Sequence, residues 1–96
     1  MWISIVTYSV ETVKTNTSNN LAILRDIQIK AQEMTDRGLG GDLLPGYENS
    51  TDIAAGSDNT FVEIKRGWHT QEAAETFVNY VLSTSDGIAT AVVEPA

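Results

Sequence analysis

The chain of 96 residues has no cysteine and a single histidine, His69. The missing cysteines exclude disulfides, thiolate metal sites and cysteine nucleophiles, and they are typical of a reducing compartment. One histidine without cysteines leaves a single chain too few ligands for an ordinary zinc site. The glycines at 38 and 40 follow a predicted helix and position 43 is leucine, so they form no dinucleotide fingerprint. We therefore expect neither a metal nor a cofactor.

Long apolar runs are also missing, because no stretch of the sequence approaches the ~20 apolar residues that span a bilayer. The first residues show no basic segment followed by an apolar run, so we expect no secretory signal peptide. These two absences predict a cytoplasmic protein that has no membrane partner.

Positive charge is scarce, with six basic residues against thirteen acidic ones and a formal net charge of −7. Nucleic-acid binders usually carry a basic patch that displaces counterions from phosphate. The basic residues here are scattered along the chain, so we expect no nucleic-acid partner. They are Lys14, Arg25, Lys30, Arg37, Lys65 and Arg66.

Hydrophobic residues make up 42% of the chain and charged residues 20%, which is ordinary for a folded protein. The length predicts one domain over residues 1–96. Runs of β-branched and aromatic residues predict four strands, and apolar residues at helical spacing predict two helices. In chain order these elements are a strand at Trp2–Val10, a helix at Ser18–Arg37, strands at Tyr47–Ala55 and Thr60–Trp68, a helix at Thr70–Ser83 and a strand at Ile88–Glu94.

The predicted order is βαββαβ, with a hairpin between the second and third strands. This order predicts an α+β, ferredoxin-like fold, in which a four-stranded antiparallel sheet carries both helices on one face. The buried stripe of the first helix is expected at Leu21, Leu24, Ile27, Ala31 and Met34, widened by Ile23. The second helix should begin at Thr70 as its N-cap and bury Ala73, Ala74, Phe77, Val78 and Val81.

The first strand is apolar on both of its faces, and the helices cover only one face of such a sheet. We place Ile3 and Ile5 on one face, and the set Trp2, Val6, Tyr8 and Val10 on the face without helices. Leaving that set in water would forfeit about 6–10 kcal/mol of burial, against roughly 5–15 kcal/mol for the stability of a whole domain. A homodimer packed sheet to sheet would cover it, together with Phe61. The alternative is that the loop from Gly38 to Tyr47 folds over this face.

Histidine is the side chain best suited to acid–base chemistry near neutral pH, and His69 is the only one in the sequence, so it is the only histidine candidate for a catalytic acid or base. Its position beside an N-cap favours a surface or interface role instead. Trp68 is a candidate for contact with a ligand, and its alternative role is to close the end of a core. Tyr8, Tyr47 and Tyr80 are further ligand-binding candidates, with the same alternative.

The junction from Trp68 through Thr70, Glu72, Ala73 and Ala74 to Phe77 is similar to the W-x-[ST]-x-E-A-[AF]-x-x-[FW] junction of the dimeric α/β-barrel superfamily. The segment Pro45-Gly46-Tyr47 resembles the P-G-[FY] that precedes the second strand in many of its members, antibiotic-biosynthesis monooxygenase-like proteins among them. The resemblance implies a homodimer, a dimeric α/β barrel with facing sheets, and a small-molecule pocket between sheet and helices.

Some members of that superfamily oxidise aromatic molecules without a cofactor, and others degrade haem. The haem-degrading members carry an axial histidine in the second helix, where this chain has Val78, Asn79, Tyr80, Val81 and Leu82.

Two hypotheses about function follow from the residues and the resemblance. The first is a non-catalytic homodimer that holds a small apolar or aromatic molecule. The second is a cofactor-independent monooxygenase or isomerase acting on an aromatic molecule, with His69 as acid or base. The scarcity of catalytic groups favours the first.

Overall fold

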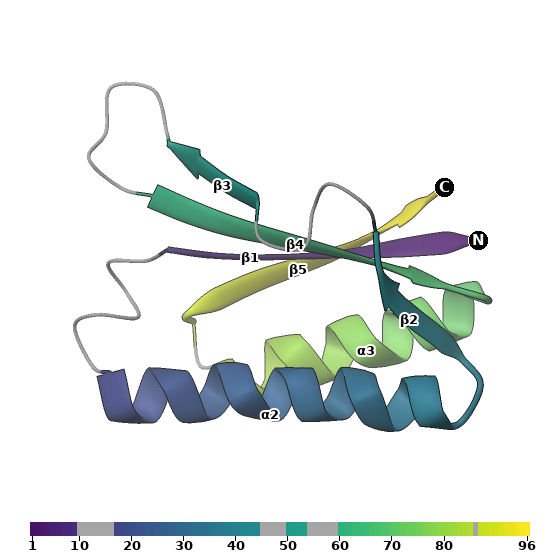
Figure 1. Cartoon of the computed structure of the whole chain (residues 1–96), viewed down its shortest axis with the longest axis horizontal. Coiled ribbons are helices and arrows are strands. Elements are labelled where there is room, and N and C mark those ends of the chain that lie inside the picture. Colours follow the sequence, from purple (N-terminus) through teal and green to yellow (C-terminus); the bar gives the residue numbers. More distant parts are fainter. Residues whose placement is uncertain (10–16, 45–49, 54–59, 86) are drawn as a thin grey trace.

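The structure, a computed structural model, describes residues 1–9, 17–44, 50–53, 60–85 and 87–96. Its described elements are two helices and five strands, which lie in two layers (Figure 1). In chain order they are β1 (Trp2–Ser9), α2 (Thr17–Asp36), β2 (Gly40–Leu43), β3 (Ser50–Ile53), β4 (Thr60–Trp68), α3 (Gln71–Thr84) and β5 (Ala89–Pro95).

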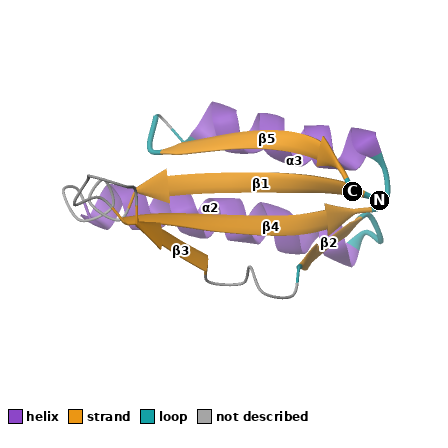
Figure 2. Cartoon of the chain, turned by 90° about the horizontal axis from the view of Figure 1, so that it is seen from above, coloured by secondary structure: helices purple, strands orange, loops and turns teal. Residues whose placement is uncertain are grey.

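The sheet is antiparallel and has the order β2-β4-β1-β5, with β3 also paired to β4. Strands β2 and β3 lie along the same edge of β4, β2 beside Trp68 and β3 beside Thr60 (Figure 2). Both helices lie on one face of the sheet (Figure 1). The predicted α+β, ferredoxin-like βαββαβ fold with its four-stranded antiparallel sheet is therefore confirmed, with the second strand in two pieces.

The second of the four predicted strands differs most from its prediction. It was expected at Tyr47–Ala55, and this is confirmed in part because β3 lies within that range and pairs with β4. The other paired segment, β2, was predicted to be irregular. Three close glycines suggested a loop, and Gly40 and Gly41 do have positive φ angles of 97° and 99°. They pair with β4 all the same, because a register shift between Gly40 and Asp42 takes up the unusual backbone.

Helix α3 agrees closely with its prediction. Thr70 is its N-cap, and its hydroxyl oxygen accepts a hydrogen bond of 3.1 Å from the backbone N–H of Ala73. The five buried residues of α3 are the five that were predicted: Ala73, Ala74, Phe77, Val78 and Val81. In helix α2 the predictions for Ile27, Ala31 and Met34 are confirmed, whereas Leu21 is 50% exposed and its neighbour Asn20 is buried.

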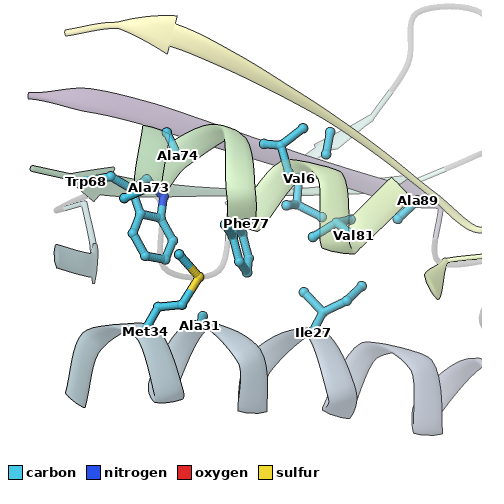
Figure 3. Close-up of a cluster of buried hydrophobic side chains, with 12 residues drawn as sticks. Val6, Ile27, Ala31, Met34, Trp68, Ala73, Ala74, Phe77, Val81 and Ala89 are labelled. Carbon is cyan, nitrogen blue, oxygen red and sulfur yellow. The ribbon is translucent and has the colours of Figure 1, made fainter. Parts of the chain in front are cut away.

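The core fills the space between the sheet and the two helices (Figure 3). Trp68, at the end of β4, is fully buried, and its ring centroid lies 5.0 Å from that of Phe77. The Nε1–H of Trp68 donates a hydrogen bond of 2.8 Å to the Oγ of Ser4 on β1. Met34 of α2 is also buried beside these rings. The alternative role of Trp68, closing one end of the core, is the one that the structure shows.

The face assigned to the first strand was wrong. Val6 is only 4% exposed and belongs to the core, and Trp2 and Tyr8 are partly buried and pack against it. This set therefore faces the helices. Because both faces of β1 carry apolar side chains, alternation alone does not say which one is covered. Ser4 lies on the same covered face: it looks like a surface residue in the sequence, but its hydroxyl accepts the Trp68 hydrogen bond in the core.

The opposite face of the sheet, which carries no helix, holds Ile3 and Ile5 of β1. Their partners in the register are Gly67 and Lys65 on β4 and Glu94 and Val92 on β5. Of the residues predicted for the dimer interface, Val10 and the side chain of Phe61 lie outside the described residues.

Candidate ligand cavity

One cavity opens between the sheet and helix α2, and we call it the Tyr8 cavity. Its walls are mostly apolar, and they come from β1, β4 and both helices. The lining residues are Val6, Tyr8, Leu24, Ile27, Gln28, Ile64, Arg66 and Phe77. The cavity is narrow: the centre of a water molecule can occupy only about 20 Å³ of its interior. All the empty space between its walls, including the mouth that opens to solvent, is about 370 Å³.

The register of the sheet explains which strand residues line this cavity. Val6 pairs with Ile64, Tyr8 with Val62, and Ser4 with Arg66, so these residues share the face that the helices cover. Helix α3 packs against β1 and β5 and less extensively against β4, whereas α2 packs against α3 and β2. The cavity therefore lies over β1 and β4, where α2 and its residues Leu24, Ile27 and Gln28 form the opposite wall.

Three polar side chains interrupt the apolar wall: Tyr8, Gln28 and Arg66. Arg66 is partly buried, and its Nη1 donates a hydrogen bond of 2.7 Å to the carbonyl oxygen of Gly41. Burial lowers the pKa of Arg66, and the nearby charge of Asp42 acts in the opposite direction. Burial also raises the pKa of Tyr8, so its hydroxyl stays protonated at neutral pH and can donate a hydrogen bond.

The structure separates the site residues that the sequence suggested. Tyr8 lines the cavity, whereas Trp68 is enclosed in the core and reaches no surface. Tyr80 is partly buried beneath the Lys30 ammonium group, which lies 5.4 Å from the ring centroid, and it does not line the Tyr8 cavity. Tyr47 lies outside the described residues.

His69 is exposed, and its backbone N–H donates a hydrogen bond of 3.1 Å to the carbonyl oxygen of Leu39. It lines neither the Tyr8 cavity nor a second pocket between the ends of α2 and α3, which is more open and has about 470 Å³ of empty space with its mouth. His69, the acid or base expected for aromatic oxidation, therefore shares no site with Trp68, a ligand-binding candidate, because Trp68 is buried in the core and His69 is exposed to solvent.

Arg66 is the cavity residue that sequence reasoning missed. A signal was present, since Val62, Ile64 and Trp68 form the apolar row of β4 and Arg66 takes the remaining place in that row. A charged side chain in an apolar row of a strand either extends along the sheet to reach solvent or bonds to a polar group in the protein interior. The residues of α2 that line the cavity could not be selected, because Leu24 and Ile27 look like ordinary core positions.

Among the described residues, no group of three or more His, Cys, Asp or Glu side chains is placed to hold a metal ion. In the same part of the chain, neither helix combines the length and the apolar composition needed to cross a bilayer. Comparisons with protein-family models, with curated proteins and with solved structures give no match for this chain.

Proposed function

We propose that the protein binds a small apolar or aromatic molecule in the Tyr8 cavity and that it acts as a homodimer. The observation that supports binding is the cavity itself. Apolar walls with a few polar side chains are typical of small-molecule sites, where the apolar surface supplies affinity and the polar groups fix orientation. Tyr8, Leu24, Ile27 and Phe77 supply such a wall here.

Binding requires the cavity to widen, because its interior as described has room for about one water molecule. Leu24 and Tyr8 are only partly buried and Gln28 is exposed, so their side chains can rotate without opening the core. Ile27 and Phe77 are buried and form the fixed wall. The proposal therefore predicts a ligand held between Phe77 and the sheet, with Leu24 and Tyr8 displaced toward solvent.

Binding of p-toluamide, a neutral aromatic probe, tests this proposal by calorimetry. We expect saturable binding to the unaltered protein and its loss in Leu24→Trp, because the larger ring fills the space that the ligand needs. Leu21→Trp is the matched control, since Leu21 lies on the same helix, is 50% exposed and does not line the cavity. Equal binding by the two variants, or no binding by the unaltered protein, would contradict the proposal.

Pairing is supported by the face of the sheet without helices. Among its described side chains, Ile3 and Ile5 are partly exposed and Val92 is 52% exposed. Lys65 and Glu63 form an ion pair of 3.6 Å on the same face, so both signs of charge are present there. A surface with both charge signs can be complementary to itself in a two-fold pair. The resemblance at Trp68–Phe77 to the dimeric α/β-barrel superfamily also favours sheet-to-sheet pairing.

Sedimentation at micromolar concentration tests the pairing, and we expect a particle of twice the chain mass of 10.4 kDa. Ile5→Lys should shift the particle to a monomer, because it places a charge in the middle of the apolar face. Ile29→Lys is the control, since Ile29 is 55% exposed on α2, in the other layer. A monomeric unaltered protein would contradict pairing and would leave the cavity proposal intact.

The oxygenase or isomerase alternative has no described observation in its favour. It needs an acid or base beside a bound aromatic ring, and the histidine expected to supply it lies outside the cavity. The ionisable side chains that do line the cavity are the phenol of Tyr8 and the guanidinium of Arg66. With its pKa raised by burial and no described base beside it, Tyr8 favours hydrogen bonding over proton abstraction.

A further inference from the structure

Arg66 is the one charged residue that lines the Tyr8 cavity. Its side chain extends over the helix-covered face of the sheet, in the same row as Ile64 and Trp68. An arginine carries five N–H donors in a planar fork. In the part of the chain that the structure describes, the guanidinium group of Arg66 makes one hydrogen bond within the protein, to the carbonyl oxygen of Gly41. Most of the fork is therefore left for water or a ligand.

The hydrogen bond to Gly41 holds the guanidinium in place rather than neutralising it. A carbonyl oxygen carries no net charge. Asp42, whose charge acts on Arg66, is exposed and makes no ion pair with it among the described residues. A positive charge that is partly withdrawn from water favours an anionic partner, because charge-assisted hydrogen bonds are stronger than neutral ones. Arginine matches the two oxygens of a carboxylate in particular.

Two further donors line the same cavity. The Tyr8 hydroxyl is protonated at neutral pH, and the Gln28 side chain carries an amide NH₂ group. With Arg66 they give the cavity several donors. The apolar residues Val6, Leu24, Ile27, Ile64 and Phe77 form the rest of its wall. The site therefore combines an apolar wall with three side chains that can donate hydrogen bonds.

We propose that the natural ligand of the Tyr8 cavity is a small aromatic or apolar carboxylate, whose carboxylate group binds the Arg66 guanidinium and whose body lies against Phe77 and Ile27. This inference rests on the proposed function, because it names the ligand class of the same cavity. The net charge of −7 gives it a sharp consequence. The overall field of the protein repels anions, so any preference for an anion over its neutral analogue must come from local groups.

The test compares p-toluate with p-toluamide, which have the same shape and differ in charge. By calorimetry we expect the unaltered protein to bind the carboxylate at least about tenfold more tightly than the amide. In Arg66→Met this preference should disappear, because the carboxylate loses an ion pair that the neutral amide does not make. Retained amide binding shows that the cavity is still formed.

Arg37→Met is the matched control, because it changes the net charge by the same amount on an exposed residue outside the cavity. It should leave the ratio of the two affinities unchanged.

A second variant, Arg66→Lys, keeps the positive charge but lacks the planar fork, so we expect a ratio between those of the unaltered protein and Arg66→Met. This variant replaces Arg66→Met if Arg66→Met does not fold.

The outcomes separate the two proposals. Equal affinities for p-toluate and p-toluamide would overturn the carboxylate assignment and leave the proposed function standing. A preference for p-toluate that persists unchanged in the Arg66 variants would also overturn the assignment. Failure of both probes to bind would overturn the proposed function and this inference together.

Discussion

Replacing Trp68 with alanine is expected to lower the free energy of unfolding by about 3–5 kcal/mol, the usual cost of truncating a buried large aromatic side chain. Trp68 is fully buried, and its ring packs against that of Phe77 with centroids 5.0 Å apart. The substitution also leaves the buried hydroxyl of Ser4 without its donor. A domain stabilised by roughly 5–15 kcal/mol would lose a large part of its stability.

Urea denaturation followed by circular dichroism measures this loss, and it does not depend on the fluorescence that the substitution removes. Trp2→Ala is the control, because Trp2 is the other tryptophan and is only partly buried at the start of β1. Its loss should cost clearly less. A Trp68→Ala protein as stable as Trp2→Ala would contradict the placement of Trp68 at the end of the core.

The second large effect is expected at Gly41, which has a φ of +99° and lies against the core. A Cβ added there would lie 2.6 Å from the Oγ1 of Thr35 and 2.9 Å from the Cη2 of Trp68. Neither neighbour can easily move, because Trp68 is buried and the Thr35 hydroxyl donates to the carbonyl oxygen of Ala31. Backbone strain and overpacking together predict a loss of about 2–5 kcal/mol for Gly41→Ala.

Gly38→Ala isolates the backbone part of this effect. Gly38 also has a positive φ, +81°, but a Cβ there would meet nothing within 4 Å. We expect a cost of about 1–2 kcal/mol for Gly38→Ala from the left-handed backbone alone. Comparison of the two variants by urea denaturation then gives the steric part. Equal losses would contradict the close approach of β2 to Trp68 and Thr35.

The elements most completely predicted from the sequence are those whose signals are local. The strand Thr60–Trp68 agrees with its prediction at both ends, and α3 agrees in its cap and its buried stripe. Thr70 can cap the helix whatever packs around it, because its hydroxyl bonds to a backbone N–H only three residues away. Periodicity alone then places Phe77 and Val81 on the inner face of α3.

The misplaced features depend on contacts between distant residues. Ser4 is buried because of a bond to Trp68, 64 positions away, and nothing near Ser4 in the sequence indicates it. The face of β1 that the helices cover was misassigned for the same reason. Strand β2 was missed because its two glycines resemble a loop until β4 is present beside them.

The candidate site was predicted in part. Tyr8 was named as a ligand-binding candidate and does line the cavity, but as a residue of the helix-covered face rather than of the open one. Arg66 was counted only among scattered charges. Its role in the cavity depends on the register of β1 with β4 and on the carbonyl oxygen of Gly41, neither of which the sequence shows directly.

The central claim is that a ligand enters between the sheet and α2 and does not bind the open face of the sheet. Methyl NMR of isoleucine-labelled protein during titration with p-toluate tests it most directly, because a bound aromatic ring shifts the resonances of the methyl groups that it touches. Ile27 and Ile64 line the cavity, whereas Ile3 and Ile5 lie on the open face. We predict shifts at Ile27 and Ile64 and none at Ile3 and Ile5; shifts confined to Ile3 and Ile5 would contradict the account.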